Sequence, residues 1–147
     1  MNRNTDYYVP VRRIQLNVES SVKGDSIVER ALHMVQTRIA RRCAATLTKR
    51  EAAYTLTVGI DPTIGTDGYR ISSDETGAVI SASCPRAVVY GLGKYLHTSG
   101  YTAEGFHPSR WQGTSVPTSP MRGIQMDTHF CNSYHTSPAH ELTEYVE

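Results

Sequence analysis

The sequence predicts an α+β protein with a small, mostly antiparallel sheet and two helices on one face, followed by the first strand and helix of a second unit. Three observations lead to this prediction. Several short segments alternate apolar and polar residues, which is typical of half-buried strands. Two longer segments repeat apolar residues every three or four positions, as amphipathic helices do. A third pattern begins at Arg122, where a short apolar segment precedes a polar loop and a helix.

Composition and charge exclude several classes of function. The 147-residue chain has 39% hydrophobic and 20% charged residues, as an ordinary globular domain does. Its 15 basic and 14 acidic residues give a net charge of +1, so no global field favours nucleic acid or an anionic membrane as partner. No apolar run approaches the roughly 20 residues of a membrane span. Residues 1–13 lack the core of a signal peptide, so the chain as written is expected to be cytoplasmic, or secreted or periplasmic if a leader is missing.

Three cysteines are present, at Cys43, Cys84 and Cys131. Their odd number and wide spacing favour neither a disulfide framework nor paired zinc ligands. We therefore expect buried free thiols, no resident metal and no cofactor.

The first strand and first helix follow from the N-terminal third of the chain. Ile14, Leu16 and Val18 alternate with polar residues, which predicts a strand. Ser26 and Glu29 have capping-box spacing, so a helix is predicted from Ser26 to about residue 44. Arginines lie on the face opposite the apolar residues. We interpret them as a solvated face, and contact with a polyanion is the alternative.

Three more strands are predicted in the middle of the chain. Residues 54–60 alternate as the first strand does. Strands near residues 69–71 and 78–82 flank residues 74–77, which is typical of a hairpin with glycine at the positive-φ position. Three aspartates lack the alternate spacing of a calcium loop and are interpreted as turn residues: Asp61, Asp67 and Asp74.

The second helix is predicted over residues 83–97. Ser83 or Cys84 is its cap, Pro85 lies in its first turn, and Gly100 stands just past its end. Helices both before and after the strands favour packing on one face of the sheet.

Two features near this helix have competing interpretations. The segment Gly91-Leu-Gly-Lys94 resembles a phosphate loop, but it lacks the following Ser or Thr and lies inside a helix. Close packing of its glycines against a neighbouring element is therefore preferred. Residues 101–120 are rich in Gly, Ser, Thr and Pro and predict a linker, with Trp111 at a domain interface.

The densest polar group follows the apolar segment that contains Ile124 and Met126. Loops at the carboxyl ends of strands are where ligand-binding groups gather in parallel α/β folds. Polar and aromatic side chains suit a sugar, which offers hydroxyls and C–H faces. The alternative is a zinc site formed by His129, Cys131 and His135, but no Cys-x-x-Cys pair supports it. A lone βα unit cannot bury its strand on both faces, so we expect a fragment of a longer protein.

The chain resembles two families of glycoside hydrolases in four motifs that occur in the same order: Gly68-Tyr-Arg-Ile71, Gly77-Ala-Val-Ile80, Arg86-Ala-Val-Val-Tyr-Gly-Leu92 and Arg122-Gly-Ile-Gln-Met-Asp127. The families are family 20, the β-N-acetylhexosaminidases, and family 67, the α-glucuronidases. The resemblance covers about residues 54–147. It implies a non-catalytic N-terminal domain over residues 1–100, a linker over 101–120, and the start of a truncated (β/α)8 catalytic barrel over 121–147.

The resemblance also implies roles for single residues. Arg122 matches an arginine that binds sugar hydroxyls in the catalytic subsite, where its fixed fork serves two oxygens. Asp127 matches the acidic residue at the end of the first barrel strand. Phe130 stands where hexosaminidases usually have a second arginine, and Met126 where glucuronidases have a tryptophan. The predicted substrate-binding residues are Arg122, Asp127, His129, Asn132 and Tyr134.

No catalytic residue is assigned, because the catalytic Asp-Glu pair of the hexosaminidases lies on a later barrel strand. The 147 residues alone are expected to be inactive, and the carbohydrate substrate is expected to bind through the full-length barrel. The alternative is a stand-alone α/β binding or interaction module without catalysis.

Overall fold

The computed structural model describes residues 6–119. This part of the chain forms two helices and eight short strands. In chain order they are β1 (Arg13–Val18), α1 (Ser26–Arg42), β2 (Thr46–Thr48), β3 (Tyr54–Ile60), β4 (Tyr69–Ser73), β5 (Gly77–Ala82), α2 (Pro85–Thr98), β6 (Gly100–Thr102), β7 (Gly105–His107) and β8 (Gly113–Ser115). Within these residues no helix is both long and apolar enough to cross a membrane.

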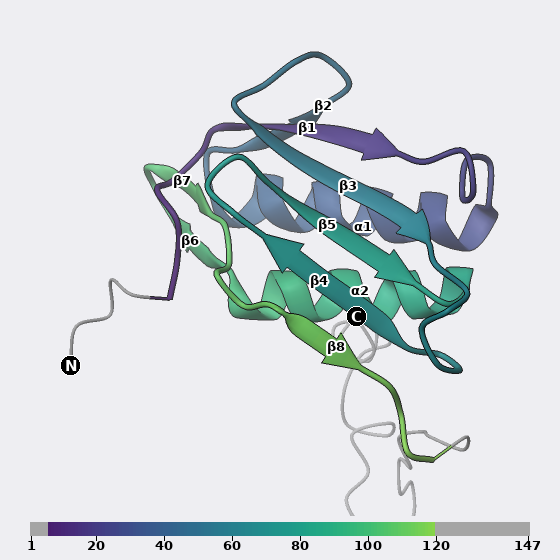
Figure 1. Ribbon diagram of the computed structural model, residues 1–147. Coiled ribbons are helices and arrows are strands. Elements are labelled where there is room, and N and C mark those ends of the chain that lie inside the picture. The colour runs from purple at the N-terminus through teal and green to yellow at the C-terminus, as the bar shows by residue number, and fades with distance from the viewer. Residues whose placement is uncertain (1–5, 120–147) are drawn as a thin grey trace, which may run out of the picture. The chain divides into compact units, whose positions relative to one another are not determined.

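Six of these strands form one sheet in the order β2-β1-β3-β5-β4-β8. β1 runs parallel to β2 and β3, and β3 runs parallel to β5. β4 runs antiparallel to both of its neighbours, β5 and β8. Both helices cover the same face of this sheet (Figure 1), and no helix of residues 6–119 covers the other face. β6 and β7 form a separate antiparallel pair.

The predicted α+β class is confirmed, as are the small sheet and the two helices on one face. The sheet is more mixed than the predicted mostly antiparallel one. α1 carries the chain back along the sheet, so β3 enters beside β1 in the same direction, as a βαβ crossover requires. The β4–β5 hairpin then places β5, rather than β4, next to β3. Antiparallel pairing is therefore confined to β4 and its two neighbours within this sheet.

The core lies between the sheet and the helices. Inward-facing residues of adjacent strands, such as Ile14, Val58 and Ile80, are at most 1% exposed. They meet apolar side chains of the helices, including Val35 of α1 and Leu92 of α2, both 2% exposed. Each buried side chain of this size contributes about 1.5–3 kcal/mol of transfer free energy. Alternation in the strands and helical spacing in the helices therefore build one shared core.

The segment predicted to be a linker belongs to this unit over most of its length. β8 pairs with β4, and Phe106 of β7 is fully buried against the rings of Tyr95 and Tyr101. Trp111 is half-buried and packs against the same core. The compact unit extends to Pro117, not to residue 100. Strands of three residues are too short to reveal themselves by alternation, which is why composition alone predicted a linker.

The residues at the N-cap positions show where each helix begins. Asp25 caps α1, because its Oδ1 accepts hydrogen bonds from the backbone N–H groups of Ile27 (2.9 Å) and Val28 (3.1 Å). The predicted cap, Ser26, is the first residue of the helix instead. Cys84 occupies the cap position of α2, directly before Pro85, as one of the two predicted alternatives. The strand and helix predicted over residues 121–147 lie outside the described residues.

Candidate functional site

The five predicted substrate-binding residues all lie outside residues 6–119: Arg122, Asp127, His129, Asn132 and Tyr134. Cys131 and His135, the other members of the possible zinc site, lie there too. Among the residues that the structure does describe, no group of three or more His, Cys, Asp and Glu side chains is arranged to hold a metal ion. The best-organised polar cluster of the described chain is at the start of α2.

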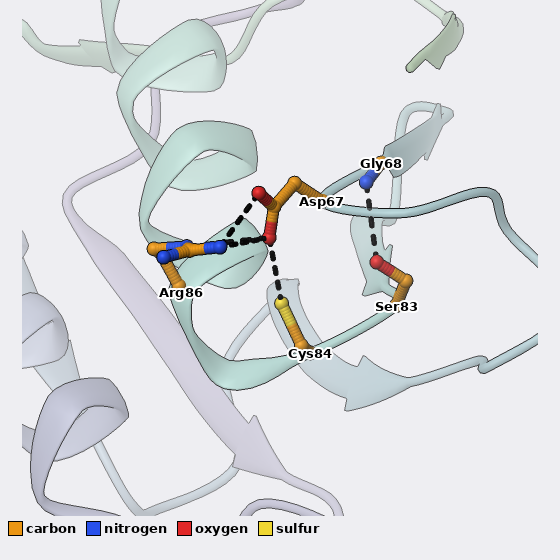
Figure 2. Close-up of polar contacts among 5 residues, drawn as sticks. All are labelled: Asp67, Gly68, Ser83, Cys84 and Arg86. Carbon is orange, nitrogen blue, oxygen red and sulfur yellow. Dashed lines mark hydrogen bonds and ion pairs between the residues drawn. The ribbon is translucent and has the colours of Figure 1, made fainter. Parts of the chain in front are cut away.

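That cluster centres on Asp67 and Arg86 (Figure 2). Arg86 Nη2 donates to both carboxylate oxygens of Asp67, at 2.8 and 2.7 Å, and Nε donates to Oδ1 at 3.2 Å. Cys84 Sγ donates to the same Oδ1 at 3.4 Å. The carboxylate is buried, with 9% of the Asp67 side chain exposed, whereas 63% of the Arg86 side chain is exposed.

The local backbone explains why these residues occupy this loop. Asp67 has φ +54°, in the left-handed region that Asp tolerates better than most residues. The next residue, Gly68, donates its N–H to Ser83 Oγ at 3.1 Å and to Gly65 O at 2.7 Å. A side chain at Gly68 would place its Cβ 2.6 Å from Gly65 O. The tight turn therefore aims the Asp67 carboxylate at the first turn of α2.

The electrostatics of the cluster favour a fixed ion pair rather than a proton-transfer site. The hydrogen bonds that Arg86 donates to Asp67, together with the charge of that carboxylate, raise the pKa of Arg86 above its already high ordinary value. The guanidinium is thus permanently charged and holds the Asp67 carboxylate in an ion pair. The pair forms part of an open groove of about 560 Å³ lined by residues 62–67, Ser83, Cys84 and Arg86. The cluster acts as a brace between the β3–β4 loop and α2.

The sequence does not predict the Asp67–Arg86 ion pair. Its pattern indicates only that Asp67 is a turn residue, like Asp61 and Asp74. That interpretation holds for the other two, because the Asp61 carboxylate accepts from Thr63, and the Asp74 carboxylate accepts from Thr76 and Gly77. These hydrogen bonds lower the pKa values of Asp61 and Asp74. Arg86 lies within a quoted motif, but no local pattern joins it to an aspartate nineteen positions earlier.

A second groove, of about 460 Å³, lies over the open face of the sheet. Its floor is polar and uncharged, with Gln15, Thr55 and Thr57 side by side on β1 and β3. Thr55 Oγ1 donates to Gln15 Oε1 at 3.5 Å, so part of this polar surface is satisfied across strands. Glu51 and Asp74 also line the groove, and the Asp74 carboxylate is used by the turn described above. The groove therefore offers hydroxyl and amide groups beside these two carboxylates.

Comparisons with known proteins give a fold relationship. No protein-family model and no curated protein sequence matches the chain. Among solved structures, a family GH20 exo-β-N-acetylglucosaminidase from Vibrio harveyi, in an inactive D437A mutant, matches with a TM-score of 0.54 at 10% identity. The match covers 76% of this chain and 17% of the enzyme chain. The same enzyme in complex with N-acetylglucosamine matches with a TM-score of 0.51 at 12% identity, over 69% of this chain and 15% of that one.

The described fold is therefore that of a domain-sized part of GH20 β-N-acetylhexosaminidases, as the resemblance to family 20 predicted. The alternative resemblance, to the α-glucuronidases of family 67, gains no support from these structures. At 10 to 12% identity the similarity shows the fold alone. The chain also spans less than a fifth of the length of these two enzyme chains.

Proposed function

We propose that the chain is the N-terminal part of a carbohydrate-active, hexosaminidase-like glycoside hydrolase. In this proposal the small domain is non-catalytic, and residues 121–147 begin the catalytic barrel. The observation that carries it is the fold match to a GH20 exo-β-N-acetylglucosaminidase over 76% of this chain but only 17% of the enzyme. The ordered motifs that end in Arg122-Gly-Ile-Gln-Met-Asp127 add independent support from the sequence.

The proposed barrel segment supplies contacts to a sugar. Arg122 donates from its guanidinium to two sugar hydroxyls, and Asp127 accepts from a hydroxyl at the end of the first barrel strand. His129, Asn132 and Tyr134 add polar and stacking contacts from the following loop. The acid and the second carboxylate that glycoside cleavage requires come from later barrel strands.

The small domain acts as a support rather than as a source of catalytic groups. Three of its carboxylates already have structural duties, because Asp67 is neutralised by Arg86 and because Asp61 and Asp74 hold turns. These duties favour the proposal that the 147-residue chain has no hydrolytic activity by itself.

The test is an assay of the chain extended through its downstream coding sequence, with an aryl N-acetyl-β-glucosaminide as substrate. We expect hydrolysis by the extended protein and none by residues 1–147. Arg122→Ala should lower kcat/KM by roughly 10- to 100-fold, because charge-assisted hydrogen bonds contribute about 1.5–3 kcal/mol each. Arg30→Ala, which removes an exposed arginine from α1, is the matched control and should leave kcat/KM unchanged. Full activity in Arg122→Ala would remove the proposed role of that residue.

The alternative proposal is a stand-alone binding module, and one observation favours it. The compact unit that reaches Pro117 has a continuous core of its own. Limited proteolysis followed by thermal unfolding separates the two proposals. A hydrolase fragment should release a C-terminal piece that is unfolded and aggregates through Ile124, Met126 and Leu142, whereas an independent module should tolerate removal of that piece with no aggregation.

A further inference from the structure

The sheet edge formed by β2 carries an unusual concentration of positive charge. We define the basic edge by six exposed cations at the start of β1, the end of α1 and the turn after β2: Arg12, Arg13, Arg41, Arg42, Lys49 and Arg50. These are six of the 15 basic residues in a chain whose net charge is only +1. More than a third of the basic residues thus lie on one edge of a nearly neutral molecule.

Hydrogen bonds bring the segments of the basic edge together. Thr46 N donates to Arg12 O at 3.0 Å, and Arg13 is paired with Thr46 in the parallel β1–β2 ladder. β2 is thereby held as the outermost strand, beside β1 (Figure 1). Arg13 Nη2 donates to Glu51 O at 3.4 Å, which draws the turn after β2 back to the start of β1. Only residues 43–45 separate the end of α1 from β2.

Within residues 6–119 none of these six cations forms an ion pair. The ion pairs Arg70–Asp61 and Arg86–Asp67 lie elsewhere. Arg12 and Arg13 donate to the backbone carbonyls of Glu104 and Glu51, not to their carboxylates. Arg42 lies over the ring of Tyr101, with 5.3 Å from Cζ to the ring centroid. Like charges gathered in this way oppose folding, so an anion from outside the domain accounts for them better than the fold does.

Local reasons explain only part of the arrangement. Arg41 and Arg42 lie in the last turn of α1, where cations interact favourably with the helix dipole. One or two charges on an edge strand also suffice to prevent pairing with another sheet. Neither reason requires Arg12, Arg13, Lys49 and Arg50 together on the same edge.

We propose that the basic edge binds an acidic polysaccharide, a chain of sugars that carries carboxylate or sulfate groups at regular intervals. Five of the six cations are arginines, whose planar fork pairs with two oxygens of such groups. The cations follow one another along several segments, which suits a linear polymer better than a single small ion. Thr46 and Thr48 lie among them on β2. Thr48 Oγ1 accepts from Arg50 N at 3.0 Å, whereas Thr46 is exposed and supplies a hydroxyl that matches those of a sugar.

Nucleic acid fits this edge less well. Domains that bind nucleic acid through charge usually have a pI above about 9, whereas this chain has a pI of 7.8. Single-stranded nucleic acid also requires exposed rings on which bases stack, and the ring of Tyr101 beside the edge already lies under Arg42. The proposal goes beyond the hydrolase function and does not depend on it, because it concerns only residues 6–119.

The test measures binding of the full 147-residue chain to an oligogalacturonide by isothermal titration calorimetry over a series of salt concentrations. A neutral chitooligosaccharide is the uncharged comparison, and poly-glutamate and duplex DNA are the competing polyanions. We expect binding to the oligogalacturonide that weakens as the salt concentration rises, and no binding to the neutral sugar. The double variant Arg41→Gln/Arg50→Gln should bind at least about tenfold more weakly. The slope of log affinity against log salt concentration should be smaller in magnitude by about 1 to 2 for this variant.

The matched control is Lys23→Gln/Arg30→Gln, which lowers the net charge by the same amount at the opposite end of α1. It should change the affinity by less than about twofold. If Arg41→Gln/Arg50→Gln does not fold, Arg12→Gln/Lys49→Gln takes its place, since thermal unfolding checks each variant first. The proposal is overturned by an absence of oligogalacturonide binding at low salt, by equal losses in the test and control variants, or by tighter binding to poly-glutamate or DNA. Failure here would leave the hydrolase proposal untouched, because that proposal is tested at Arg122.

Discussion

The phenolic oxygens of Tyr54 and Tyr95 lie 2.9 Å apart within the core and join β3 to α2. Both side chains are only 1% exposed, so each hydroxyl depends on the other for a hydrogen bond that water does not supply. The pair therefore forms a buried hydrogen bond between the sheet and the helix layer.

Removing one hydroxyl should cost more than removing both. Tyr54→Phe or Tyr95→Phe leaves a buried hydroxyl without its partner, which costs about 1–3 kcal/mol of unfolding free energy. The double variant replaces both partners with apolar groups of the same shape and should lie close to the unmodified protein. Urea unfolding of the four proteins forms a double-mutant cycle. Strictly additive losses would show that the two hydroxyls do not interact.

The same pair predicts a loss of stability at high pH. Burial raises the pKa of Tyr54 to about 12 and raises that of Tyr95 as well. The unfolded chain loses these protons near pH 10, before the folded chain does. The contribution of the two tyrosines to the unfolding free energy is therefore fully present below about pH 10 and declines toward pH 12. Tyr54 alone accounts for a fall of about 3 kcal/mol across that range. Unfolding free energies between pH 8 and 12 should show a shallower decline in Tyr54→Phe than in Tyr90→Phe, a control at a partly exposed tyrosine.

The two glycines of α2 should respond to alanine in opposite ways. At Gly91 an added Cβ would lie 2.7 Å from Ile80 Cγ2, in a fully buried part of the core, so Gly91→Ala should cost about 1–3 kcal/mol through overpacking. At Gly93 nothing lies within 4 Å of an added Cβ, so Gly93→Ala should gain about 0.5–1 kcal/mol of helix propensity. Chemical denaturation of both variants measures whether the unfolding free energy falls for Gly91→Ala and rises for Gly93→Ala. A stabilised Gly91→Ala would contradict the close packing of α2 on the sheet.

Asp67→Asn should weaken the brace at the start of α2. Asparagine tolerates the left-handed backbone at this position, so the change removes the charge without adding backbone strain. We expect a loss of about 1–2 kcal/mol, because the freed guanidinium of Arg86 is exposed enough to regain water. Asp61→Asn is the same substitution at the more exposed ion pair with Arg70, where N and O are 3.6 Å apart, and should lower the unfolding free energy less than Asp67→Asn does. Equal shifts in the urea midpoint of the two variants would argue against a special role for Asp67.

Much of the fold could be predicted because its signals are local. Alternation over residues 54–60 and helical spacing in both helices identify elements whose buried faces repeat at a fixed period. The β6–β7 pair and β8 could not be found in that way, since each strand has three residues and is defined by its partner. The parallel pairing of β5 with β3 is likewise a property of the assembled sheet.

The candidate site shows the same division between local and long-range signals. The turn roles of Asp61 and Asp74 depend on residues two and three positions away and were predicted correctly. The ion pair of Asp67 with Arg86 joins a loop to a helix, and only the folded chain brings the two together. The basic edge is assembled from three segments for the same reason, although the arginines of α1 were visible in the sequence. The predicted sugar contacts at Arg122 and Asp127 lie outside the described residues and stay predictions.

The start of α1 gives a final prediction that distinguishes two adjacent residues. Capping-box spacing pointed to Ser26, but Asp25 accepts the hydrogen bonds from Ile27 N and Val28 N. Its carboxylate also lies at the positive end of the helix dipole. Asp25→Ala should therefore lower the unfolding free energy by about 1 kcal/mol, whereas Ser26→Ala, at an exposed position inside the first turn, should change it by less than about 0.5 kcal/mol. Thermal and urea unfolding of the two variants measure this difference. A larger loss of unfolding free energy in Ser26→Ala than in Asp25→Ala would indicate that Ser26, through the capping box, is the residue that caps this helix.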